Sequence, residues 1–268
     1  MFLDDGQSNA ERELAAINLA IQHGARLTGV ALASMKPKHA PKEDEKAIAR
    51  MGDRLARGLV EQFAATTAAA DVAATTLIIQ GDARTSGLKM AHYARNADLV
   101  MLAQPDPAND NFIRQQEFAQ QVMLHSGRPV FFMPYIGGRK IPFERVLIAW
   151  DGTPAASRVV HDAMPLLALA EETTILVVES RKQRQTKQDV LVEGLQGHLQ
   201  RHGVNTGIRR INPGGNSVPT TILNQIGESD IDLLVMGGYG TPTLKQKVFG
   251  TVSQILLTSM IVPVVMSH

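Results

Sequence analysis

A glycine-rich stretch near the carboxyl end of the chain contains residue types suited to binding an anion. Gly237-Gly238-Tyr239-Gly240 is followed by nine residues and then by Gly250-Thr251, which gives the spacing G-x2-G-x9-G-[ST]. Glycine permits positive φ and lets backbone amides approach phosphate oxygens closely. Gly250-Thr251 is expected to open a helix, whose first N–H groups would form a phosphate seat with the hydroxyls of Thr251 and Ser253. The spacing therefore predicts a nucleotide-binding loop.

Asp151 is the second candidate, because it follows the first buried strand of the same half. Ligands of open α/β sheets bind beyond the carboxyl ends of the strands, where the winding direction reverses. Asp151 is therefore expected to face Gly237 and to accept hydrogen bonds from ribose hydroxyls or help to hold a metal ion. A plainer interpretation stays open, in which the glycines are turn residues, Asp151 or Thr153 caps one helix, and Thr251 and Ser253 cap another.

The elements expected around these residues alternate between strand and helix. Val146 to Ala149 is an apolar run without alternation, which is typical of a strand buried on both faces. Pro154 suits the first turn of the following helix, and Pro165 should kink or shorten it. Alternating strands and helices of this length predict a parallel sheet. The remaining elements are expected at 174–178 (strand), 188–202 (helix), 208–211 (strand), 218–226 (helix), 233–236 (strand), 251–259 (helix) and 262–266 (strand).

The chain also repeats itself. Residues 98–102 align with 232–236 at an offset of 134, and 129–132 align with 263–266 at the same offset. The repeat predicts two tandem α/β domains, each with a five-stranded parallel sheet. A Gly-rich segment at 135–140 has linker composition. The domains are expected at 1–137 and 143–268, and the elements of the first are expected at 10–23 (helix), 27–32 (strand), 43–63 (helix) and 72–79 (strand).

The amino-terminal end of the first half is shorter than its counterpart. Asp5-Gly6 aligns with Asp151-Gly152 at an offset of 146, so the first half has 12 additional residues, expected in its middle helix. Only three residues precede Asp4, although this first strand should lie in the middle of its sheet. Either Met1 is internal to a longer reading frame, or the first domain tolerates a shortened central strand.

The glycine motif is missing from the first half. At the constant offset, Ala103 stands for Gly237 and Asp106 for Gly240, while Gln116 and Glu117 stand for Gly250 and Thr251. A carboxylate near a phosphate is repelled by about 4 kcal/mol at an effective dielectric constant of about 20. We therefore expect no ATP in the first half, which would serve as a structural partner of the second.

Composition excludes several classes of function. The 268 residues include 27 Lys and Arg against 26 Asp and Glu, so charge implies no nucleic acid partner. The absence of cysteine excludes disulfides and thiolate chemistry. The apolar runs are too short to span a bilayer and no signal pattern is seen, so a soluble cytoplasmic protein is expected. P-loop, dinucleotide and nucleophile-elbow motifs are absent from the sequence.

In combination, four features resemble the universal stress protein family of UspA type: the opening at 147–152, the strand at 232–237, the glycine loop with Val252-Ser253 after it, and the closing segment at 262–265. The resemblance implies two tandem domains with strand order 3-2-1-4-5 and, where the glycine motif is kept, ATP or a related adenine nucleotide, possibly with Mg²⁺. Pro242 and Tyr239 depart from the family pattern. The resemblance places the nucleotide as follows: Asp151 near the ribose, the backbone around Val178 at the adenine, Met236 and Gly237 on the sugar side, and Gly240, Gly250, Thr251 and Ser253 around the phosphates. Ala149 and Val252 are also expected in the site.

We expect a binding protein rather than an enzyme, because only Asp151 could orient a water for hydrolysis. The expected partners are an adenine nucleotide and the other half of the chain, as a pseudo-dimer, with a homodimer also possible. Two alternatives stay open: a nucleotide-free structural or interaction protein, and a weak ATPase.

Overall fold

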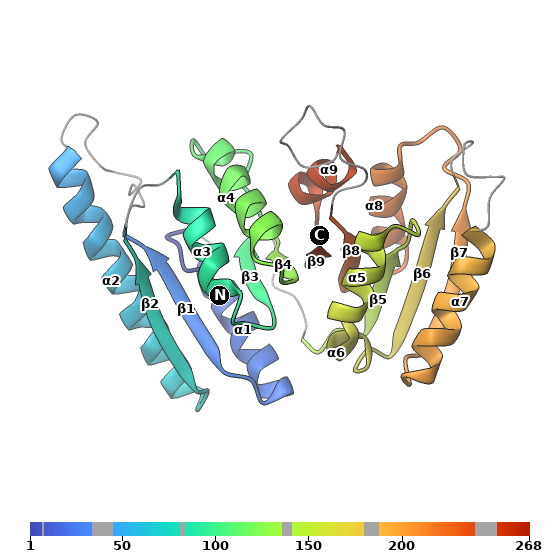
Figure 1. Ribbon diagram of the computed structural model, residues 1–268, viewed down its shortest axis with the longest axis horizontal. Coiled ribbons are helices and arrows are strands. Elements are labelled where there is room, and N and C mark those ends of the chain that lie inside the picture. The colour runs from blue at the N-terminus through green and yellow to red at the C-terminus, as the bar shows by residue number, and fades with distance from the viewer. Residues whose placement is uncertain (7, 34–44, 81–83, 136–140, 180–187, 239–250) are drawn as a thin grey trace. The chain divides into compact units, whose positions relative to one another are not determined.

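The computed structural model describes the chain except for residues 7, 34–44, 81–83, 136–140, 180–187 and 239–250 (Figure 1). The chain forms two compact units, Met1–Ser126 and Gly127–His268. The domain boundaries expected from the sequence, 1–137 and 143–268, stay a prediction.

The second unit contains a sheet in which strands β7, β6, β5, β8 and β9 are neighbours in that order. All four pairings among them are parallel. Numbered from β5, this run has the order 3-2-1-4-5, so the winding predicted for this half is confirmed. The strands of the unit are β4 (Val130–Met133), β5 (Arg145–Ala149), β6 (Glu172–Val178), β7 (Thr206–Ile211), β8 (Leu233–Gly237) and β9 (Val264–Ser267).

The prediction of two separate five-stranded parallel sheets is wrong in one respect here. β4, expected as the last strand of the first half, lies in the second unit and pairs antiparallel with β9. The sheet of this unit is therefore mixed. Phe131 and Phe132 on β4 are fully buried. Pairing with β4 also covers β9, which would otherwise be a free edge of the sheet.

The helices of the second unit follow the expected pattern. Pro165 interrupts the first of them: one helix ends at Asp162 and a second, short one carries Pro165 in its first turn, where no N–H is needed. The apolar positions Val159, Ala163 and Leu167 are all buried. The described helices of this unit are α5 (Pro154–Asp162), α6 (Met164–Leu167), α7 (Gln188–Arg201), α8 (Val218–Glu228) and α9 (Thr251–Ser259).

The first unit has a smaller regular sheet, in which β1 and β2 pair in parallel. Its middle helix, α2, has 25 residues against 14 in α7, which accounts for most of the additional length of this half. The helix continues past the expected end at Phe63, because the sequence from there to Ala69 is rich in alanine. The elements are α1 (Asn9–His23), β1 (Leu27–Leu32), α2 (Glu45–Ala69), β2 (Ala74–Ile79), α3 (Ser86–Ala94), β3 (Val100–Ala103) and α4 (Phe112–His125).

The expected first strand of this unit is reduced to a single bridge between Phe2 and Val30. Its backbone still bonds on both sides, since the Phe2 amide donates to the Met101 carbonyl at 2.9 Å and the Leu3 amide donates to the Val30 carbonyl at 2.8 Å. Phe2 thus connects β1 to β3 in the place that β5 occupies between β6 and β8. The described residues of this unit do not form a five-stranded sheet.

No described helix is both long enough and apolar enough to cross a membrane.

Candidate functional site

The carboxyl ends of three neighbouring strands meet at Ala149. Ala149 is the last residue of β5 and pairs with Leu176 of β6 and Met236 of β8. Met236 is buried, while Ala149 and Val178, at the end of β6, are half-buried. Three of the predicted site residues therefore lie at one edge of the sheet, at the switch point where ligands of such sheets bind.

Asp151 lies just beyond that edge and is exposed. Its Oδ1 accepts hydrogen bonds from the Thr153 backbone amide at 3.0 Å and from the Thr153 hydroxyl at 2.7 Å. The Thr153 side chain in turn accepts from the Ala156 amide at 3.2 Å, so Thr153 is the cap of α5. Asp151 thus supports the cap through one oxygen, and Oδ2 makes no hydrogen bond within the described part of the chain. That oxygen is available to accept hydrogen bonds from a hydroxyl group.

Gly237 fixes how closely α5 approaches the sheet. A Cβ built on Gly237 would lie 2.6 Å from the Ala156 nitrogen and 2.9 Å from the Ala155 carbonyl carbon, both backbone atoms that cannot rotate away. Only glycine allows this contact. The end of β8 therefore holds the first turn of α5, and Asp151 before it, against the switch point.

The first turn of α5 is satisfied by its own cap. Pro154 has no N–H, while the Ala156 and Ser157 amides donate to the side chain and backbone oxygens of Thr153. This helix end therefore supplies packing rather than an anion seat. Phosphate groups would have to be bound by other backbone groups. The sequence analysis predicts that the glycine loop supplies them.

Much of the predicted phosphate site lies outside the described residues. Gly240, Gly250 and the side chain of Thr251 are in this group. On α9, Val252 is half-buried and Ser253 is 3% exposed. The burial of Ser253 fits a helix-capping or packing role as well as the predicted phosphate contact, and its role stays a prediction.

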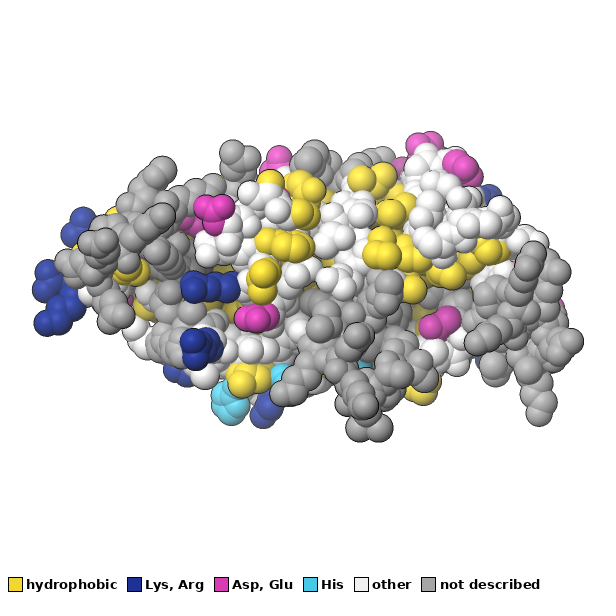
Figure 2. Space-filling model, turned by 90° about the horizontal axis from the view of Figure 1, so that it is seen from above, with side chains coloured by type: hydrophobic (Ala, Val, Ile, Leu, Met, Phe, Trp, Pro, Cys, Tyr) yellow, Lys and Arg dark blue, Asp and Glu magenta, His cyan; other side chains and the backbone are white. Residues whose placement is uncertain are grey.

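The described surface offers little charge for phosphates or metals. Figure 2 looks onto the end of the second unit at which β6 finishes, and outside the grey residues its right-hand part shows hydrophobic side chains with few Lys or Arg. Among the described residues, no three His, Asp or Glu side chains are placed to hold a metal ion.

Three histidines of this unit lie together, although the sequence analysis did not single them out. The rings of His161 and His198 are 5.1 Å apart and those of His198 and His202 are 4.6 Å apart. Burial lowers the pKa of His198, and the nearby His202, His161 and Arg201 lower it further. The spacing of His198 and His202, one helical turn apart, was the available signal.

Comparison with known proteins identifies the region that contains this site. Residues 142–268 match the model of the universal stress protein family. A universal stress protein from Archaeoglobus fulgidus DSM 4304 is similar in structure over 100% of this chain and 95% of its own, with a TM-score of 0.74 and 16% identity. A protein of unknown function from Pseudomonas aeruginosa PAO1 is similar over 99% and 90%, with a TM-score of 0.65 and 12% identity.

These two likenesses concern the fold along the whole chain. No curated protein matches the sequence. The α/β fold thus resembles that of a universal stress protein over both units. The match to the universal stress protein family itself lies within the second unit, at residues 142–268.

Proposed function

We propose that the second unit binds ATP, or a related adenine nucleotide, at the carboxyl ends of β5, β6 and β8. One observation carries the proposal: the contact of Gly237 with the backbone of Ala155 and Ala156 places Asp151 beside the strand from which the glycine loop departs. The loop spacing in the sequence, G-x2-G-x9-G-[ST], supports a phosphate seat directly after that point.

In this proposal the ribose hydroxyls donate to the Oδ2 atom of Asp151, while Oδ1 keeps its two bonds to Thr153. The backbone near Val178 contacts the adenine, Met236 and Gly237 contact the sugar, and the loop from Gly240 to Ser253 surrounds the phosphates. The nucleotide would act as a regulatory or stabilising ligand, and the first unit as a structural partner.

We further propose binding rather than turnover. A hydrolytic site needs a group that orients water in line with the γ-phosphate. Asp151 is the acidic candidate, and its placement at the sugar side with one oxygen bonded to Thr153 does not suit that task. A weak ATPase is the competing function, which a single-turnover measurement of ADP release distinguishes from binding.

The direct test is calorimetric titration of Mg²⁺-ATP into the full chain. We expect one saturable site per chain, abolished by Gly240→Asp, which copies the first-half residue Asp106. Absence of saturable binding to the unaltered chain would overturn the proposal. Two sites per chain would contradict the structural role assigned to the first unit.

The ribose contact has a sharper test. Asp151→Asn keeps an amide oxygen for the bonds to Thr153 but replaces the accepting Oδ2 with a donor, so ATP affinity should fall about tenfold. The unaltered chain should lose a similar factor when ATP is replaced by its 3′-deoxy or 2′-deoxy analogue. In Asp151→Asn, one of the two analogues should bind about as tightly as ATP, because the hydroxyl that it lacks no longer has an acceptor. If the affinity of each analogue relative to ATP is the same in the variant as in the unaltered chain, Asp151 does not contact the sugar.

A further inference from the structure

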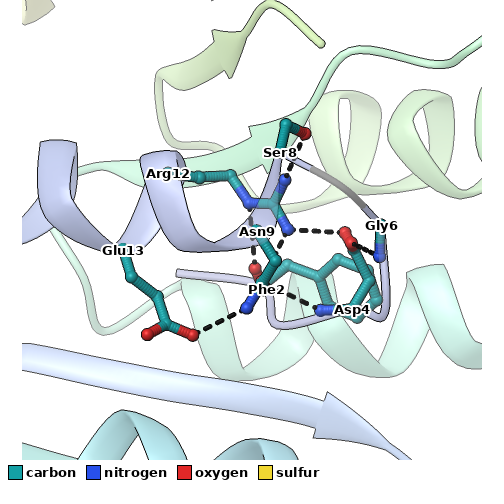
Figure 3. Close-up of polar contacts among 7 residues, drawn as sticks. All are labelled: Phe2, Asp4, Gly6, Ser8, Asn9, Arg12 and Glu13. Carbon is teal, nitrogen blue, oxygen red and sulfur yellow. Dashed lines mark hydrogen bonds and ion pairs between the residues drawn. The ribbon is translucent and has the colours of Figure 1, made fainter. Parts of the chain in front are cut away.

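Arg12, on α1 of the first unit, is a completely buried arginine. Its side chain is 0% exposed and its Nη2 donates to Asp4 Oδ2 at 2.6 Å and to Asn9 Oδ1 at 2.9 Å (Figure 3). Longer bonds of 3.4 Å run from Nε to the Phe2 carbonyl and from Nη1 to the Ser8 hydroxyl. Every nitrogen of the guanidinium thus has an acceptor, as a buried charge requires.

The acceptors are themselves fixed in place. Asn9 donates from Nδ2 to Glu13 Oε1 at 2.7 Å, and its Oδ1 also accepts from the Asp4 amide at 3.2 Å. Asp4 Oδ1 accepts from the Gly6 amide at 2.8 Å. These bonds hold Asn9 Oδ1 and Asp4 Oδ2 toward the guanidinium. The arrangement is therefore a preformed cage for one planar cation, and Arg12 fills it.

The second unit has an arginine at the same place in its sequence. At the offset of 146 that aligns Asp5 with Asp151, Arg12 corresponds to Arg158. Arg158 is exposed and donates from Nη1 to the His268 carbonyl. The same side chain, seven residues after an Asp-Gly pair, is thus buried in one unit and on the surface in the other.

The neighbours explain the difference. The side chains that surround Arg12, and Glu13 behind them, have apolar or ring residues as their counterparts. At these four positions the second unit therefore has no side-chain acceptor for a buried guanidinium. The corresponding pairs at this offset are Asp4 and Trp150, Ser8 and Pro154, Asn9 and Ala155, Glu13 and Val159.

We propose that the carboxyl end of the first strand in the first unit is a cation site, occupied by Arg12 as an internal ligand. The site is built by Phe2, Asp4, Ser8 and Asn9, and its chemistry selects a planar guanidinium. Arg12 takes the Oδ2 acceptor of Asp4, whereas in the second unit the Oδ2 atom of Asp151, the counterpart of the neighbouring Asp5, makes no hydrogen bond within the described part of the chain. This assignment goes beyond nucleotide binding by the second unit and does not depend on it.

Removing the arginine side chain while leaving the cage tests the proposal. In Arg12→Ala the acceptors remain, so methylguanidinium at low millimolar concentration should bind and restore stability in a saturable way. We expect Arg12→Ala to melt lower than the unaltered chain by on the order of 10 °C, and methylguanidinium to recover about half of that loss. If the variant is isolated unfolded, the refolded yield with and without methylguanidinium is the readout.

Three controls keep the result specific. Arg158→Ala should lower the melting temperature by about 2 °C or less and show no response to methylguanidinium, because Arg158 is exposed. Asp4→Asn should lower stability without gaining a response, since Arg12 still fills the site. Tetramethylammonium, which has no N–H groups, should not rescue Arg12→Ala. An Arg12→Ala variant as stable as the unaltered chain, or one that methylguanidinium does not stabilise, would overturn the assignment.

Discussion

The segments that follow the first strand of each unit use the same sequence pattern for opposite purposes. In the second unit, Asp151 supports the helix cap and keeps one oxygen open, and Arg158 points to the surface. In the first unit, Asp4 is bonded to Arg12, and the buried polar group is complete within the unit. The difference teaches that polar residues at four positions that are apolar in the other repeat allow a buried arginine to be satisfied within its own unit.

The largest effect should come from Gly237→Ala, which gives β8 the Cβ that Ala103 already has at the corresponding place in β3. That Cβ would lie 2.6 Å from the Ala156 nitrogen, so α5 would have to move away from the sheet. We expect the second unit to lose about 3 kcal/mol of unfolding free energy, measured by urea denaturation.

A matched glycine provides the control for this substitution. Gly227 lies in α8 with no atom within 4 Å of the position of a Cβ, so Gly227→Ala should leave stability unchanged or raise it by about 0.5 kcal/mol. Equal effects of the two substitutions would mean that the close contact at Gly237 does not determine how α5 packs.

A smaller effect is expected at the helix starts. The Thr153 side chain caps α5, whereas the Ser8 side chain makes no cap bond to α1 and instead accepts a bond of 3.4 Å from Arg12. Thr153→Ala should therefore cost about 1 kcal/mol, and Ser8→Ala less than half as much. Denaturation of both variants under one set of conditions checks the order, and a larger loss for Ser8→Ala would reverse the contrast between the units.

The buried carboxyl of the first unit should appear in the dependence of stability on pH. Burial raises the pKa of Glu13 above its usual value of 4.5, against the lowering effects of Asn9 and Arg12. The folded state therefore holds this proton more tightly, and the contribution of Glu13 to stability falls as pH rises from about 4.5 through the raised pKa. In Glu13→Gln, stability relative to the unaltered chain should increase over that window. A difference that stays constant with pH would contradict the raised pKa.

The smallest effect is expected in the second unit, from the three histidines whose rings lie close together. The pKa of His198 is lowered from 6.5, so the unfolded chain takes up this proton first and stability should fall as pH drops below about 6.5. His198→Gln should reduce that fall, while His125→Gln, at an exposed position of α4, should not. Urea denaturation at about pH 7.5 and pH 5.5 measures both. An unchanged pH dependence in His198→Gln would exclude the cluster as its source.

The alternation of strands with helices in the second unit could be predicted from sequence because its signals are local, whereas the strand order 3-2-1-4-5 was implied by the resemblance to a known family. The apolar run at 146–149, the interruption at Pro165 and the alternation of strands with helices each depend on neighbouring residues. The strand order in turn predicted that one edge of the sheet contains Ala149, Asp151, Met236 and Gly237. The glycine loop was identified by spacing alone, and its role is settled only by binding measurements.

What could not be predicted depends on contacts between residues distant in sequence. The apolar residues of β4 fit a last parallel strand of the first half as well as an antiparallel partner of β9, and sequence periodicity does not distinguish the two. The burial of Arg12 was missed because an arginine on a helix is normally exposed. Asn9 and Glu13, one helical turn apart on the otherwise apolar face of α1, were the available sign of a buried polar group.

The pairing of β4 with β9 has a consequence for handling the second unit as a fragment. A polypeptide cut at residue 142, where the family match begins, would lack Val130 to Met133 and leave β9 as a bare edge strand. The uncovered residues Val264, Val265 and Met266 are fully buried in the intact chain. Such a fragment should self-associate through this edge, whereas one that starts at Gly127 keeps β4 paired with β9.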